Sequence, residues 1–217
     1  MSQARLRAIY SATLPNTRIR GERWYYVAHD DLGIIANDYD VEPWRVAAVT
    51  AVLSPNVRWE TNLDDAATVI EYAKFVQSGG MSELDAFREC KVSTYNNNKY
   101  KAFQIMLNTS ADVVEDFVKG PKVHSFYHNL NGNLSFVTID SHIYNAWMGY
   151  RATGSKLPGI PARSRRIIVN DISTLAYREG IEPAQMQAIL WLRHIERIQL
   201  GRVDGYSRMR EGQKDGD

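Results

Sequence analysis

Proline residues introduce three of the apolar segments in this chain, and their positions constrain the fold more than any other feature. Pro43, Pro121 and Pro183 each precede a run whose hydrophobic residues recur at helical spacing. Proline is favoured at the first position of a helix, because its φ suits the helix and its missing N–H costs nothing there. Strand patterns are scarce elsewhere in the sequence. The sequence therefore predicts an all-α fold.

The predicted helices follow one another with short connections. Pro43 is expected to open the first of them, which ends at Leu53. Asn62 is expected to cap the second, and Gly79 and Gly80 to end it. Further helices are predicted over residues 83–90, 98–107, 111–118, 121–130, 141–148, 162–178 and 183–198. We expect residues 1–207 to form one compact unit and residues 208–217 to form a flexible polar tail.

Composition constrains the function of the chain less than its sequence pattern constrains the fold. The chain has 217 residues, 44% of them hydrophobic, which suffices for one globular core or for two small lobes that share a cleft. A net charge of +1 neither supports nor excludes nucleic-acid binding. The single Cys90 excludes an intramolecular disulfide and four-cysteine metal sites. With no apolar run of membrane length, we expect a cytoplasmic protein without a membrane partner.

A lysine and an aspartate lie at the starts of two consecutive predicted helices. Gly120 and Pro121 announce the first helix, and Lys122 follows one residue inside it. Exposed N–H groups and the positive end of the helix dipole disfavour a second positive charge there, which makes a neutral, nucleophilic amine easier to reach. The β-branched residues Val137–Ile139 predict extended chain that ends at Asp140, an N-cap candidate. Taken singly, a solvated lysine and a capping aspartate are simpler interpretations of both residues.

Two polar segments are candidate ligand contacts. LSPNVRWETN, residues 53–62, joins two predicted helices, and Asn56 offers both a donor and an acceptor there. TYNNNKYKAF, residues 94–103, gathers amides and two lysines at a helix start, which suits phosphate contacts. A Ser-Pro-Asn turn and a solvated capping segment explain them as well. For RSRR, residues 163–166, an exposed charged face is the preferred interpretation.

Aromatic residues follow both charged candidates, and metal-site motifs are missing. Phe126 and Tyr127 follow Lys122, and Tyr144 follows Asp140. Core packing is their default role, but such rings can also line a pocket for an extruded base. HExxH, Walker, dinucleotide and GxSxG motifs are absent, and we find no metal-ligand spacing among the five histidines. We therefore expect neither a metal nor a cofactor.

The order of these motifs resembles that of the helix-hairpin-helix DNA glycosylase superfamily, especially its endonuclease III-like branch. In that family an LSxQ loop enters the DNA, a YNxKA segment opens a later helix, and a glycine-rich hairpin precedes a lysine. An extended segment then ends in VDTH with a catalytic aspartate. Here LSPN (53–56), NKYKA (98–102) and VTIDSH (137–142) match, and the interval from Lys122 to Asp140 fits the family pattern. The resemblance covers about residues 44–148 and implies two helical lobes around a central cleft.

The resemblance implies a role for each matching residue. Lys122 would attack the sugar C1′ and form a Schiff base, while an ionised Asp140 would stabilise positive charge on the sugar. Asn56 would fill the space left by the flipped nucleotide. Backbone N–H groups near Gly120 would hold a phosphate of double-stranded DNA. The remaining implied contacts are Lys101, Pro121 and His142 with the DNA, and Phe126, Tyr127 and Tyr144 with the base.

Three departures from the family pattern are visible. DFVKG, residues 116–120, replaces the usual LPGVG hairpin, with Val118 at the position of the first glycine. Asn145 replaces the arginine often found after the aspartate motif, and the cysteines of the iron–sulfur cluster in many relatives are absent. The chain is also similar to uncharacterised proteins of bacteriophages that infect actinobacteria. That similarity suggests modified DNA bases as substrates and a phage-encoded origin in a bacterial host.

Three functions are therefore consistent with the sequence. The first is a DNA glycosylase, with or without AP-lyase activity, that acts on a damaged or modified base. The second is a base-hypermodification enzyme on the same scaffold. The third is a catalytically silent DNA-binding module in which Lys122 and Asp140 are structural.

Overall fold

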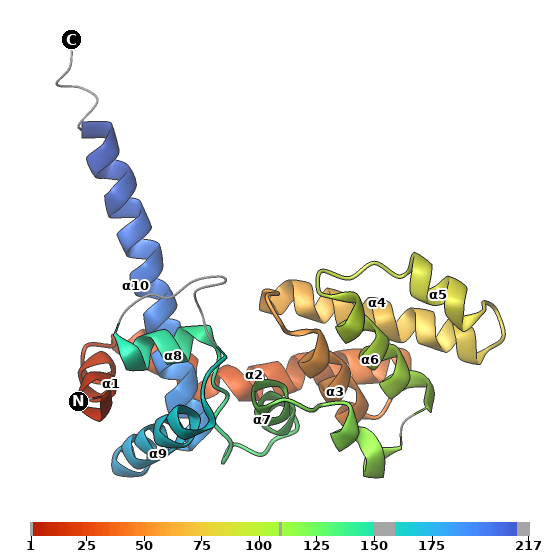
Figure 1. Ribbon diagram of the computed structural model, residues 1–217, viewed down its shortest axis with the longest axis horizontal. Helices are drawn as coiled ribbons and strands as arrows, with labels where there is room; N and C mark the ends of the chain where they lie inside the picture. The colour runs from red at the N-terminus through yellow and green to blue at the C-terminus, as the bar shows by residue number, and fades with distance from the viewer. Residues whose placement is uncertain (1, 109, 150–158, 212–217) are drawn as a thin grey trace. The chain divides into compact units, whose positions relative to one another are not determined.

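The computed structural model describes residues 2–108, 110–149 and 159–211. Across these ranges the regular elements are all helices, so the predicted all-α fold is confirmed (Figure 1). The elements are α1 (Ser2–Ser11), α2 (Pro15–Tyr39), α3 (Pro43–Leu53), α4 (Trp59–Gln77), α5 (Glu83–Glu89), α6 (Asn96–Asn108), the 3₁₀ helix η1 (Ala111–Asp116), α7 (Pro121–Leu130), α8 (Ser141–Met148), α9 (Ala162–Glu179) and α10 (Pro183–Glu211).

Helices with strong local start signals lie where the sequence predicted them. Helices α3 and α7 both begin at a proline in the first turn, and α8 begins directly after a capping aspartate. All three also end at the predicted residue. Val137–Ile139 is buried, irregular chain between α7 and α8.

The predicted cap of α4 is wrong. The helix begins at Trp59, and Asn62 is buried inside it. Its side-chain amide donates to the carbonyl of Thr50, near the end of α3, at 3.1 Å. Asn62 therefore satisfies a carbonyl near the end of a neighbouring helix rather than the start of its own.

Other boundaries also differ from those predicted. Residues 111–116 form a 3₁₀ helix rather than an α-helix running to Val118. Helices α5 and α9 differ from the prediction by one residue at one end, and α6 is longer than predicted at both ends. Helix α10 continues to Glu211, beyond the predicted end at Ile198. The predicted tail over 208–217 therefore falls partly in this helix and partly outside the described residues.

Helices α1 and α2 were not recognised from the sequence pattern. In α2, the buried residues Tyr25, Ala28, Leu32 and Ala36 recur three or four positions apart. This is the spacing of one helix face. Charged residues and two glycines within α2 obscure the signal, because glycine weakens helix propensity.

The described residues group into two compact units. Unit 1 comprises Met1–Trp24 with Ile139–Asp217, and unit 2 comprises Tyr25–Thr138. Residues 15–24 of α2 belong to unit 1 and residues 25–39 to unit 2. The division into units does not test the two lobes around a central cleft, which remain a prediction.

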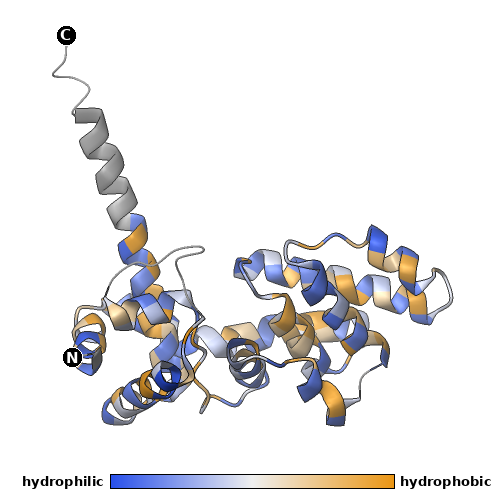
Figure 2. Cartoon of the chain, viewed as in Figure 1, coloured by the Kyte–Doolittle hydropathy of each residue, from blue (hydrophilic) through white to orange (hydrophobic). Residues whose placement is uncertain are grey.

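Helix α3 is the centre of unit 2. Every residue from Val46 to Leu53 is buried, and Figure 2 shows the hydrophobic character of this helix. It packs against α4, α6 and α7. A helix with so little polar surface is stable only when neighbours surround it, which explains its place in the core.

In unit 1, helix α10 packs against α1, α8 and α9, and it also meets the first part of α2 at a glycine. Gly21 is buried, and a Cβ there would lie 2.6 Å from the Cα of Ile189. Such a contact requires the backbone to move. The side-chain amide of Gln185 donates to the carbonyl of Glu22 at 2.8 Å beside this contact.

Replacing Gly21 by alanine is expected to lower the free energy of unfolding by about 1–3 kcal/mol, the usual cost of overpacking. Gly33 in the same helix is the matched control, since a Cβ there would meet no atom within 4 Å. Gly33→Ala should raise the free energy of unfolding by about 0.5–1 kcal/mol through helix propensity. Urea denaturation of both variants measures the difference. Equal effects would contradict the close contact at Gly21.

None of the helices in the described part of the chain is long and apolar enough to cross a lipid bilayer.

Candidate functional site

Lys122 occupies the second position of α7, as the sequence predicted. Gly120 is the N-cap with a φ of 110°, and Pro121 follows in the first turn. Gly120 has no side chain with which to cap this helix start, and a Cβ on it would meet no atom of the described residues within 4 Å. Positive φ favours glycine, and the open space lets another molecule approach the backbone closely. A helix start of this kind suits an anion, and the half-buried Lys122 lies within it.

The turn before α7 departs from a glycine-rich hairpin in a definite way. Val118 is fully buried, and its N–H donates to the carbonyl of Val114 at 3.2 Å. An exposed ion pair of 2.9 Å joins Lys119 to Asp116. Val118 therefore anchors the turn in the core of unit 2, and Gly120 supplies the positive φ.

Asp140 is the N-cap of α8, and both of its carboxylate oxygens accept hydrogen bonds. Oδ1 accepts from the N–H of Ile143 at 2.8 Å, which confirms the predicted cap. Oδ2 accepts from the indole Nε1 of Trp191 at 3.0 Å. Two donors from separate helices hold the carboxylate in one orientation. The second donor was not predicted from the sequence, because Trp191 lies on α10, 51 residues further along the chain.

Two further candidates, His142 and Tyr144, lie on the same helix α8 in unit 1. The His142 ring stands nearly perpendicular to Trp191 at 6.4 Å and lies 5.7 Å from His194, both between centroids. Tyr144 is buried and packs on Trp147, with centroids 6.2 Å apart. Asp140 and His142 thus share the neighbour Trp191. The side of α8 that carries Tyr144 is part of the core.

The structure brings together two motifs that the sequence shows as separate. Asn56 has a φ of 65° and is exposed in the α3–α4 loop. Its side-chain amide donates to the Tyr95 hydroxyl at 2.9 Å, and Thr94 donates to the carbonyl of Pro55 at 3.2 Å. The LSPN loop and the segment before α6 therefore form one surface. Tyr95 is exposed on it and was not singled out from the sequence.

The two lysines of the NKYKA segment have different surroundings. Lys99 is buried, and its ammonium donates to the carbonyls of Phe87 at 2.6 Å and Cys90 at 3.0 Å. Burial lowers the pKa of Lys99 and raises that of the Cys90 thiol to about 11. Lys99 therefore connects α6 to the end of α5. The prediction that the lysines of this segment contact phosphate is wrong for Lys99. Lys101 is half-buried, and its DNA contact stays a prediction.

Phe126 and Tyr127, the base-pocket candidates of unit 2, are buried in α7. The ring of Phe126 meets those of Tyr25 and Trp59 edge-on, each at 6.4 Å. Burial, followed by the charge of Glu115, raises the pKa of the Tyr127 hydroxyl. Both side chains contribute to the core of unit 2, and their base contact stays a prediction.

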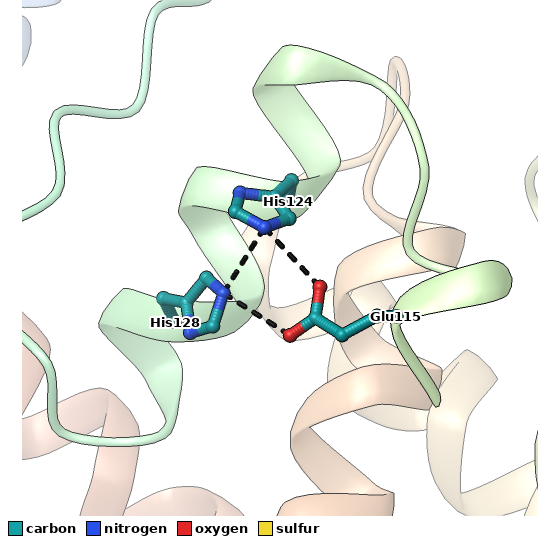
Figure 3. A group of neighbouring side chains, drawn as sticks. All are labelled: Glu115, His124 and His128. Carbon is teal, nitrogen blue, oxygen red and sulfur yellow. Dashed lines mark hydrogen bonds and ion pairs between the residues drawn. The ribbon is translucent and has the colours of Figure 1, made fainter. Parts of the chain in front are cut away.

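One cluster of polar side chains was missed by the sequence analysis. Glu115 from η1 meets His124 and His128 from α7, and the three side chains point toward one another (Figure 3). Burial lowers the pKa of His128, against the opposing effect of Glu115. The four-residue spacing of the histidines on a predicted helix was a usable signal, since such residues share one face. The position of Glu115 became visible only in the fold.

The predicted site residues divide between the two units. Unit 1 holds Asp140, His142 and Tyr144, and unit 2 holds Asn56, Lys101, Gly120, Pro121, Lys122, Phe126 and Tyr127.

Comparison with known proteins identifies a family. The model of a family of unknown function, DUF7178, matches residues 1–197, so the chain belongs to this family. No curated protein and no solved structure matches the chain.

Proposed function

We propose that this member of the DUF7178 family is a DNA glycosylase that removes a damaged or modified base from double-stranded DNA. One observation carries the proposal. Lys122 and Asp140 lie at the starts of the successive helices α7 and α8, the arrangement that the resemblance to helix-hairpin-helix glycosylases requires. The order of the LSPN, NKYKA and VTIDSH segments supports it.

In the proposed reaction, the neutral amine of Lys122 attacks C1′ of the target nucleotide. The glycosidic C–N bond breaks, its electron pair leaves with the base, and the base takes up a proton. Opening of the sugar ring then gives a Schiff base between C1′ and Nζ. Water hydrolyses this intermediate, or elimination of the 3′ phosphate cleaves the strand. A covalent intermediate divides one difficult displacement into easier steps.

Asp140 is proposed to act electrostatically. As base departure begins, positive charge develops on the sugar, and a fixed carboxylate stabilises that charge. Its hydrogen bonds to Ile143 and Trp191 support this role, because they hold the carboxylate without reorganisation during the reaction.

Two further contacts with DNA are proposed for unit 2: one with a backbone phosphate and one in the space left by the flipped nucleotide. The backbone N–H groups at the start of α7 are proposed to bind a phosphate, in the open space beside Gly120. Asn56, held by Tyr95 on an exposed loop, is proposed to fill the position of the flipped nucleotide.

The test uses duplexes that each carry one modified base, together with an abasic duplex. We expect free base in the supernatant by mass spectrometry, and a covalent protein–DNA adduct after borohydride reduction. Base modification without release would favour a hypermodification enzyme. DNA binding without either product would favour the silent module and contradict the proposal.

A further inference from the structure

Three metal-ligating side chains converge across the turn that precedes α7. The Nε2 atoms of His124 and His128 lie 3.2 Å apart. Each also lies 3.2 Å from a carboxylate oxygen of Glu115, His124 from Oε2 and His128 from Oε1 (Figure 3). The donor atoms thus form a compact group that joins η1 to the first two turns of α7.

With Glu115 ionised, the N–H groups of the two histidines cannot form a hydrogen bond at all three contacts. Each neutral imidazole has a single N–H, and an ionised carboxylate has none, so the group has at most two protons for three close contacts. At least one contact then places two lone pairs, or two N–H groups, against each other. A cation between the donors would contact all three residues at once, because each offers one ligand atom to the group.

The spacing also suits coordination. Zinc lies about 2.0–2.1 Å from histidine nitrogen and about 2.0–2.2 Å from carboxylate oxygen. At those bond lengths, neighbouring ligand atoms are about 3.0 Å apart in octahedral geometry and about 3.4 Å apart in tetrahedral geometry. The observed 3.2 Å separations lie between these values. Little rearrangement is needed to receive an ion.

The surroundings hold the rings in place and leave access from solvent. Phe136 stacks on His128 with centroids 4.3 Å apart and an interplanar angle of 12°. It also meets His124 edge-on at 5.6 Å. The side chain of Glu115 is 49% exposed, so an ion can reach the group from the surface.

We propose that Glu115, His124 and His128 form a binding site for a divalent first-row transition metal, with zinc as the reference ion. Two imidazoles and one carboxylate are a donor set for zinc and its neighbours rather than for calcium or magnesium. The bound ion fastens η1 to α7 across residues 117–120 and steadies the turn that carries Gly120. Three protein ligands leave at least one position for water. The site does not depend on the proposed glycosylase activity.

The test begins with the full chain after chelation and dialysis, titrated with zinc chloride by calorimetry. One ion is expected to bind per chain. The His124→Ala, His128→Ala and Glu115→Gln variants should each weaken binding more than the loss of an outer-shell partner, which costs about 10- to 100-fold. Circular dichroism establishes that each variant is folded, and Glu115→Gln keeps the shape of the side chain it replaces.

Two variants serve as matched controls. Asp116→Asn removes a neighbouring η1 carboxylate that pairs with Lys119, and His29→Ala removes a histidine that contacts the carbonyl of Leu130. Both should bind zinc like the unaltered chain. Zinc at a hundred times Kd should raise Tm by about 5–10 °C in the unaltered chain and in both controls, but not in the ligand variants.

Selective heteronuclear NMR of the histidine rings supplies an independent readout. Zinc should shift the Nε2 signals of His124 and His128 and leave that of His29 unchanged. Two results overturn the proposal. One is that the unaltered chain does not bind zinc, and the other is that the His124→Ala and His128→Ala variants bind zinc as tightly as the unaltered chain.

Discussion

Replacing Lys122 by alanine is expected to abolish the borohydride-trapped adduct with DNA. Base release should fall by on the order of a thousandfold or more, since removing a nucleophile eliminates the covalent route. DNA affinity should change little, because the proposed phosphate contacts are made by other groups and stay in place. Gel analysis of trapped complexes and single-turnover base release measure the two effects.

Lys119 is the matched control for this experiment. It lies three residues earlier, is largely exposed and pairs with Asp116. Lys119→Ala makes the same substitution in the turn that precedes α7, and its adduct should form at the rate of the unaltered chain. If Lys122→Ala still forms the adduct, the nucleophile is a different amine.

Replacing Asp140 by asparagine is expected to slow base release by about 10²- to 10³-fold, the usual loss when one preorganised electrostatic group is removed. The amide oxygen can still accept from the N–H of Ile143. The amide nitrogen would then face the indole N–H of Trp191, so one hydrogen bond is lost. That loss should lower the free energy of unfolding by only about 1 kcal/mol. Single-turnover kinetics and urea denaturation separate the two effects.

Trp191→Phe tests the same hydrogen bond from its other side. It removes the indole donor but keeps the carboxylate and its cap on α8. Stability should fall by an amount similar to that in Asp140→Asn, while base release should fall much less. If Asp140→Asn lowers stability and leaves the rate unchanged, Asp140 is only a helix cap.

Local chemistry explains why some elements were predictable. Helices α3 and α7 begin with proline, and α8 begins with an aspartate whose carboxylate bonds to a backbone N–H three residues on. Each signal operates within one turn of helix, so a single sequence contains it. The same reasoning failed at Asn62, where the amide bonds to a carbonyl of another helix. Asparagine suits both positions, and only packing selects between them.

The sequence by itself determined the helical class, the starts of α7 and α8, and the residues that occupy those starts, because helix propensity, proline geometry and capping act over a few residues. The tertiary structure decided which of the candidates acquire partners. It buried Lys99, placed Trp191 on the carboxylate of Asp140, joined Asn56 to Tyr95, and brought Glu115 to His124 and His128. These contacts join separate elements, and only the packing of helices brings such residues within bonding distance.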